Sequence, residues 1–303
     1  MKAFLTELTL FVLFALAFYA VGLLAFPSFL KRNVHQSGNS HFYFTLKEAK
    51  LTQGIDLLFL GSSHTYRSFD PRIFKSAGIS SINLGSSAQT PMQTQILVNR
   101  YLTQLNPKKV IFEVNPLIFS LDGVESAMEL TANDTITPSI VFMVAGLFNL
   151  KAYNTLFNSW LRQAFHLNSV QKPYRGVNTY IKGGFVERKM SYFHHKTYNS
   201  QRWLIKKEQV KYFTETLAYI QNKGVSVVLV QAPITRDLYN SYKNNLEFDN
   251  LMRSTRLPYY NFNNIIFLDD SLHFYDGHHL NQKGVELFNR KLIEMSNGSI
   301  LLR

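Results

Sequence analysis

Five short apolar runs, each ending in small or polar turn residues, limit most what this chain can fold into. Each run has four to six residues and is rich in β-branched or aromatic side chains. None of them alternates regularly between apolar and polar positions. They span residues 56–60, 79–84, 110–114, 225–230 and 265–268. Strands that are buried on both faces of a parallel sheet have this composition.

Helical patterns fill the intervals between these runs. They cover Thr90–Leu105, Arg202–Lys223 and Asn281–Ser296. Strands that alternate with helices predict an α/β fold with a doubly wound, mostly parallel sheet. The region from about 117 to 200 breaks the alternation and is interpreted as an insertion. Its apolar part, Ile136–Leu150, is too short to span a bilayer, so a buried helix and an interfacial helix both stay open.

The N-terminus carries a long apolar stretch. Leu8–Leu30 contains no charged residue and is long enough to cross a hydrocarbon core of about 30 Å as a helix. It is too long for the apolar region of a cleaved signal peptide, and a buried core helix is the alternative. We therefore predict a membrane anchor at 1–32, a connector at 33–54 and a catalytic domain at 55–303. The flanking charges, Lys2 against Lys31 and Arg32, weakly favour a cytoplasmic domain.

The positive net charge of the chain indicates which classes of partner it could bind. The formal net charge is +12, and twelve Lys or Arg stand against two Glu between Lys151 and Lys211. Three interpretations remain for this basic, aromatic-rich segment: a solvated face, a surface for an anionic polymer or lipid headgroup, and, least favoured, a nucleic-acid site. Its candidate contacts are Lys172, Arg175, Lys182, Arg188 and Lys189. The chain has no cysteine, which excludes disulfides and a Cys nucleophile.

Two short motifs carry the candidate chemistry. Gly61-Ser62-Ser63-His64 follows the first apolar run, where a serine on a tight strand-to-helix turn presents its hydroxyl at the edge of the sheet. A turn with a helix cap is the alternative. Asp276-Gly277-His278-His279 precedes the last helix, and its Asp and His, three residues apart, can contact each other. There the alternative is a solvated loop.

The two motifs together resemble those of the SGNH, or GDSL-like, hydrolase superfamily. The resemblance implies a flavodoxin-like three-layer fold, with Ser63 as nucleophile and His279 and Asp276 as its partners in a catalytic triad. It also implies that Gly85 and Asn115 contribute to an oxyanion hole. Ser62 stands where the family has aspartate. Residues 55–120 and 220–296 carry the resemblance.

The Gly-Ser-Ser variant, the N-terminal anchor and Asp-x-x-His-Leu-Asn together resemble one bacterial branch of that superfamily. This branch contains DltD-like proteins and partners of membrane-bound O-acyltransferases. It implies a single-pass protein of the cytoplasmic membrane with an extracytoplasmic domain, against the charge count. It also implies a multi-spanning acyltransferase as partner and an acylated surface polymer or lipid as substrate.

The expected activity is therefore O-acyl transfer or ester hydrolysis on a cell-surface polysaccharide, through an acyl-serine. A non-catalytic scaffold for a membrane-bound acyltransferase is the alternative. Ser62, His64 and His278 are candidates for lining the site, and His278 competes with His279 as the base. His194-His195 has no partner at ligand spacing, so no metal is expected. No phosphate-binding glycine loop occurs, and we expect no cofactor and no nucleic-acid partner.

Overall fold

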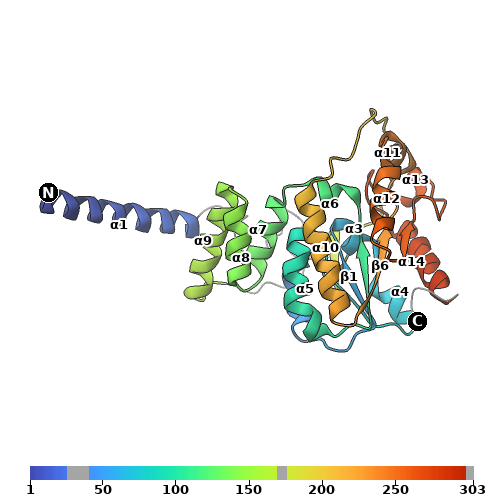
Figure 1. The fold of residues 1–303 in the computed structure, drawn as a ribbon, viewed down its shortest axis with the longest axis horizontal. Coiled ribbons are helices and arrows are strands. Elements are labelled where there is room, and N and C mark those ends of the chain that lie inside the picture. Colours follow the sequence, from blue (N-terminus) through green and yellow to red (C-terminus); the bar gives the residue numbers. More distant parts are fainter. Residues whose placement is uncertain (26–40, 169–175, 298–303) are drawn as a thin grey trace.

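The computed structural model describes residues 1–25, 41–168 and 176–297. A five-stranded parallel sheet lies at its centre, in the order β2-β1-β3-β6-β7 (Figure 1). Its strands are β1 (Leu57–Leu60), β2 (Ser81–Asn83), β3 (Lys109–Glu113), β6 (Ser226–Gln231) and β7 (Tyr259–Asn261). The predicted doubly wound parallel fold is confirmed, and the strand order is that of a flavodoxin-like sheet.

Helices cover both faces of the sheet because successive strand residues point into two different cores. Leu58 and Leu229 face one core, whereas Phe59 and Val228 face the other. The first core is covered by α2 (His41–Ala49), α5 (Pro91–Leu105), α6 (Pro116–Ser120), α10 (Lys207–Asn222) and α12 (Asn245–Ser254). The second is covered by α3 (Ser63–Ser68), α4 (Pro71–Ser76) and α14 (Gln282–Asn297).

The last strand differs from the prediction. We expected it at residues 265–268, but β7 is Tyr259–Asn261, directly after Pro258. A proline before an edge strand costs no hydrogen bond of the sheet, so it does not prevent pairing there. The apolar run after it lies on a turn, where Ile266 N–H donates to the Phe262 carbonyl at 3.3 Å and Phe267 is 71% exposed. That run packs on the second core from outside the sheet.

The region between residues 117 and 200 forms two structures beside the sheet. Three helices, α7 (Val124–Asn133), α8 (Pro138–Gly146) and α9 (Leu150–Ala164), stack at one end of the body (Figure 1). The strands β4 (Asn178–Ile181) and β5 (Phe185–Arg188) form an antiparallel hairpin. The Ile136–Leu150 segment thus contains a helix with both buried and exposed apolar residues. Ile140 is buried, whereas Phe142 is 76% exposed.

One long apolar helix, α1 (Lys2–Ala25), projects from the body along its long axis (Figure 1). Leu23 is its one buried residue, and among the described residues α1 is the one helix whose length and composition suit a membrane span. A signal sequence has the same properties. The expected span of Leu8–Leu30 overlaps this helix, but residues 26–40, including Lys31, Arg32 and part of the connector, lie outside the described residues.

Candidate active site

The candidate nucleophile lies on a turn that only glycine permits. Gly61 has a φ of 139°, and a Cβ at this position would lie 2.8 Å from the Glu113 carbonyl oxygen. The turn leads from β1 directly into α3, whose first residue is Ser63. The backbone N–H at the first position of a helix has no acceptor within the helix. Ser63 therefore presents both a hydroxyl and a free backbone donor at the carboxyl end of β1.

Ser63, His279 and Asp276 form a continuous hydrogen-bonded chain. The Ser63 hydroxyl lies 2.9 Å from His279 Nε2, across 216 residues of sequence. The other ring nitrogen, Nδ1, lies 3.0 Å from each carboxylate oxygen of Asp276. Because a carboxylate can only accept, Nδ1 carries the proton and Nε2 is left to accept from Ser63. This is the tautomer that a general base needs.

The Asp276 carboxylate is held in its ionised form. Burial opposes its charge, but hydrogen bonds from the His279 ring and from backbone groups outweigh burial and lower the pKa of Asp276 to about 2. The N–H groups of His278 and His279 both donate to its Oδ1 at 2.8 Å. The carboxylate therefore stays negative at neutral pH and orients the imidazole.

A second, buried histidine lies beside this chain. The rings of His64 and His279 stack with centroids 5.1 Å apart. Asn115 Oδ1 accepts from the Leu117 N–H as a helix cap, which directs its Nδ2 towards His64 Nε2 at 3.2 Å. The other nitrogen of His64 lies 3.4 Å from the Ser62 hydroxyl. Burial, reinforced by the neighbouring His279, lowers the pKa of His64 well below its ordinary value, so it is neutral.

Asn115 reaches this site because its strand lies next to β1. It follows β3, and the chain leaves β1 towards β2 on one side and returns as β3 on the other. Ligands of open α/β sheets bind where the strand order reverses in this way. Asn115 is fully buried, and its Nδ2 contacts His64.

Gly85 differs from its expected role as an oxyanion donor. Its N–H donates to the Asn83 side-chain oxygen at 2.8 Å and is therefore already engaged. The glycine is needed for another reason, since a Cβ at Gly85 would lie 2.7 Å from the Ser62 carbonyl oxygen. It allows the loop after β2 to pack directly under the turn that carries Ser63.

Tyr275, in the turn before α14, and Arg188, at the end of β5, form a pair beside the site that the sequence did not single out. The Tyr275 ring is nearly parallel to the His279 ring, at 9° and 5.5 Å between centroids. The Arg188 guanidinium lies 4.6 Å from the centre of the same tyrosine ring. Stacking restricts the imidazole to one plane, and the arginine holds the tyrosine against it.

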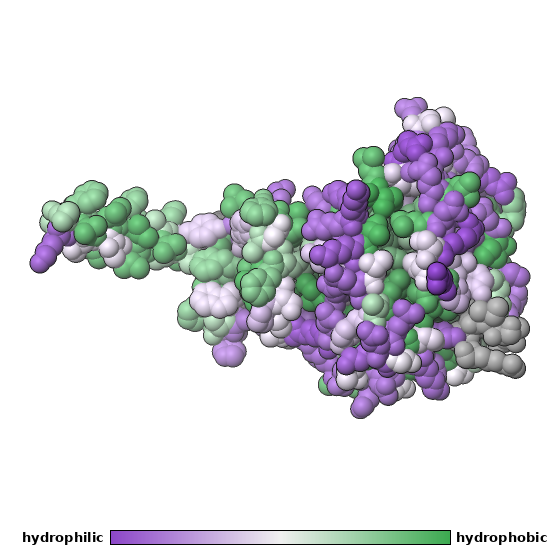
Figure 2. All heavy atoms as spheres, in the orientation of Figure 1, coloured by the Kyte–Doolittle hydropathy of each residue, from purple (hydrophilic) through white to green (hydrophobic). Residues whose placement is uncertain are grey.

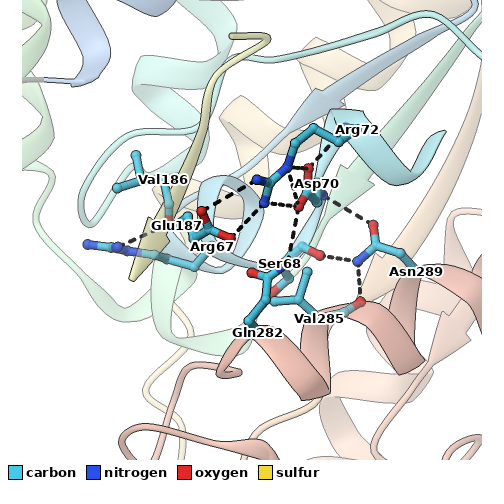
Figure 3. A network of polar contacts seen from close by, with 9 residues as sticks. All are labelled: Arg67, Ser68, Asp70, Arg72, Val186, Glu187, Gln282, Val285 and Asn289. Carbon is cyan, nitrogen blue, oxygen red and sulfur yellow. Dashed lines mark hydrogen bonds and ion pairs between the residues drawn. The ribbon is translucent and has the colours of Figure 1, made fainter. Parts of the chain in front are cut away.

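A polar network joins the two segments that carry the candidate triad (Figure 3). The Asn289 amide on α14 donates to the Ser68 carbonyl at 2.5 Å, at the end of α3. Its oxygen accepts from the Asp70 N–H at 3.2 Å. Asp70 also binds Arg72, which pairs with Glu187 of β5 at 2.8 Å. The network connects α3, α4, α14 and the hairpin, and it joins the end of α3 to α14.

Of the remaining candidate residues, some lie beside the site, some lie on the surface, and some lie outside the described residues. His278 is largely buried, its pKa is lowered by that burial, and its Nδ1 has no hydrogen-bond partner within the described structure. Lys182 and Lys189 are exposed at the turn and the end of the β4–β5 hairpin. Lys172 and Arg175 lie outside the described residues.

Comparison with known proteins returns solved structures of low sequence identity. No protein-family model matches the chain, and no curated protein is similar to it. A "putative acylhydrolase" from Bacteroides fragilis is 12% identical with a TM-score of 0.45, over 86% of this chain and 96% of that one. A GDSL-like lipase from Bacteroides thetaiotaomicron is 13% identical with a TM-score of 0.42, over 85% and 98%. A lipase/acylhydrolase from Enterococcus faecalis is 13% identical with a TM-score of 0.34, over 82% and 99%.

Proposed function

We propose that this chain is a membrane-anchored serine esterase or O-acyltransferase that works through an acyl-serine. The observation that carries the proposal is the hydrogen-bonded chain from Ser63 through His279 to Asp276, with distances of 2.9 and 3.0 Å. Hydroxyl, imidazole and carboxylate in this order activate a serine for attack on a carbonyl carbon.

The steps follow from the proton positions. His279 Nε2 takes the proton of Ser63 as its oxygen bonds to the acyl carbon, and the same proton then goes to the leaving alcohol. Water or a sugar hydroxyl next loses its proton to His279 and attacks the acyl-serine. The bond between the acyl carbon and the Ser63 oxygen then breaks, and His279 returns the proton to that oxygen. The oxyanion of each tetrahedral intermediate would be stabilised by the Ser63 backbone N–H.

A fluorophosphonate tests the nucleophile directly. We expect covalent labelling of the full-length protein in detergent, on Ser63, and none in Ser63→Ala. Ser76→Ala is the control, since Ser76 is an exposed serine on α4 whose hydroxyl donates only locally, to the Ile73 carbonyl. Equal labelling of Ser63→Ala and wild type would refute the triad, and complete absence of labelling would favour the scaffold alternative.

The proposed substrate is an acylated polymer or lipid outside the cytoplasmic membrane, with a multi-spanning acyltransferase as partner. The long apolar helix α1 supports attachment to a membrane, and the basic residues of the β4–β5 hairpin support an anionic substrate, whereas the extracytoplasmic side rests on the resemblance of the motifs. A reporter active only outside the cytoplasm, fused after residue 303, should be active. Activity of a cytoplasmic reporter alone would reverse the orientation.

A further inference from the structure

Helix α9 exposes large aromatic side chains, while most of its buried side chains, Leu161 excepted, are small or polar. Its inward face carries Ala152, Thr155 and Ser159, which are all buried. Its outward face carries Tyr153, 36% exposed, and Trp160, 52% exposed, on either side of the half-buried Phe157. A helix on the surface of a soluble protein shows the reverse arrangement.

Exposed apolar residues continue at both ends of this helix. Phe148 and Leu150 precede or begin it, at 88% and 70% exposure. Phe165 and Leu167 follow it, at 65% and 46%. We call these four residues together with Trp160 the α9 face. An apolar surface of this extent marks an interaction site, and Figure 2 shows apolar residues gathered over this end of the body.

The end of α1 is joined to α9 by its backbone. The Leu24 carbonyl accepts from Arg162 Nη2 at 3.1 Å, and the Leu23 carbonyl accepts from the amide of Asn158. The last carbonyls of a helix have no partner within it, so these side chains cap α1 and fix its exit. Tyr19 also stacks on Phe157, at 6.0 Å between centroids. Figure 1 shows α8 and α9 stacked across the base of α1.

The charge of residues 135–186 favours an anionic membrane surface as the partner of the α9 face. From Thr135 to Val186 the sequence contains no Asp or Glu, while Lys151 and Arg162 lie on α9 itself. Aromatic rings at the water–hydrocarbon boundary and cations near anionic headgroups characterise segments that lie in a membrane interface.

We infer that the α9 face lies in the headgroup and upper acyl region of the bilayer that α1 crosses. The catalytic domain would then be held in a fixed orientation at the membrane surface instead of swinging on a tether. This inference concerns lipid contact and does not depend on the chemistry proposed for Ser63.

The two tryptophans of the chain allow a direct test. Trp160 belongs to the α9 face, whereas Trp203 is 4% exposed and stacks on Tyr242. The full-length protein is placed in nanodiscs of phosphatidylcholine and phosphatidylglycerol whose acyl chains are brominated near the headgroup. We expect bromolipid quenching several-fold greater in wild type than in Trp160→Phe, which keeps Trp203 as its background.

A matched reporter controls for position. Leu287→Trp in the Trp160→Phe background places the ring on the exposed side of α14, at the opposite end of the body (Figure 1). It should be quenched by aqueous iodide and not by bromolipid. Iodide quenching of Trp160 without bromolipid quenching would overturn the inference, because the face would lie in water. Protection of Trp160 from both quenchers would overturn it as well, in favour of a covering protein.

Discussion

Replacing Asn289 with leucine should loosen the contact that joins the end of α3 to α14. Leucine has a similar volume but no polar atoms, so the Ser68 carbonyl and the Asp70 N–H lose the partners they have at 2.5 and 3.2 Å. Asn289 is fully buried, so water does not replace it. A buried polar group left without a partner costs about 1–3 kcal/mol. Two such groups, partly offset by the added apolar contact, reduce the free energy of unfolding by about 3 kcal/mol.

For a domain of this size that loss corresponds to a fall in the unfolding midpoint of about 6–12 °C. Tryptophan fluorescence of the full-length protein in detergent measures it, since Trp203 is buried in the domain. Asn250→Leu is the control, because Asn250 is exposed on α12. The unfolding midpoint of this variant should stay within about 2 °C of wild type. An Asn289→Leu midpoint as close to wild type as that of the control would refute the role of this network. Esterase activity measured well below both midpoints should fall only in Asn289→Leu.

Three further predictions concern the site and its surroundings. His279→Ala should remove most esterase activity. Asp276→Ala should reduce activity less, because Asp276 orients the imidazole and is not itself the base. Equal turnover in wild type and both variants would contradict the triad. Burial raises the pKa of Glu113 from 4.5 to about 8, so the folded protein holds a proton that the unfolded chain releases. Stability should therefore fall as pH rises from 4.5 to 8, with Glu113 contributing up to about 1.4 kcal/mol per pH unit; denaturant unfolding of Glu113→Gln should show a shallower dependence, since buried Glu129 also has a raised pKa, and an unchanged slope would contradict the prediction. Lys182→Ala with Lys189→Ala should weaken salt-sensitive sedimentation with an anionic polymer and leave hydrolysis of a small neutral ester unchanged; binding that ignores both salt and substitution would favour a solvated basic face.

Sequence pattern was sufficient for the parts of the fold that are buried on both sides. Four of the five apolar runs overlap strands of the sheet, and three of these strands, β1, β3 and β6, are central strands with both faces buried. The fifth strand was misplaced because β7 is an edge strand after Pro258 and needs no such run. The approach of Ser63 to His279 was predicted from the two motifs together, since Ser63 follows β1 whereas His279 lies in the turn before α14.

Contacts that depend on the path of a turn could not be predicted in this way. Nothing in the sequence indicates that Tyr275 stacks on His279, since the turn around Asp276 decides which way that ring points. Whether the Gly85 N–H has an acceptor depends similarly on the rotamer of Asn83, because the Asn83 side-chain oxygen accepts the hydrogen bond from it. The link between Asn289 and Ser68 joins two helices whose relative position follows from the whole second core.

For helix α9, the sequence pattern could not predict whether its apolar face contacts protein or lipid. Tyr153, Phe157 and Trp160 recur at intervals of four and three residues, and this spacing predicts a face turned to the protein core. Periodicity, however, shows only which face of a helix is buried away from water. It does not show whether that face is buried by protein or by lipid. The small side chains of Ala152, Thr155 and Ser159 let the opposite face pack closely against the body. A helix that buries its small residues and is joined to the end of a membrane-length helix is best explained by a bilayer as the second apolar phase.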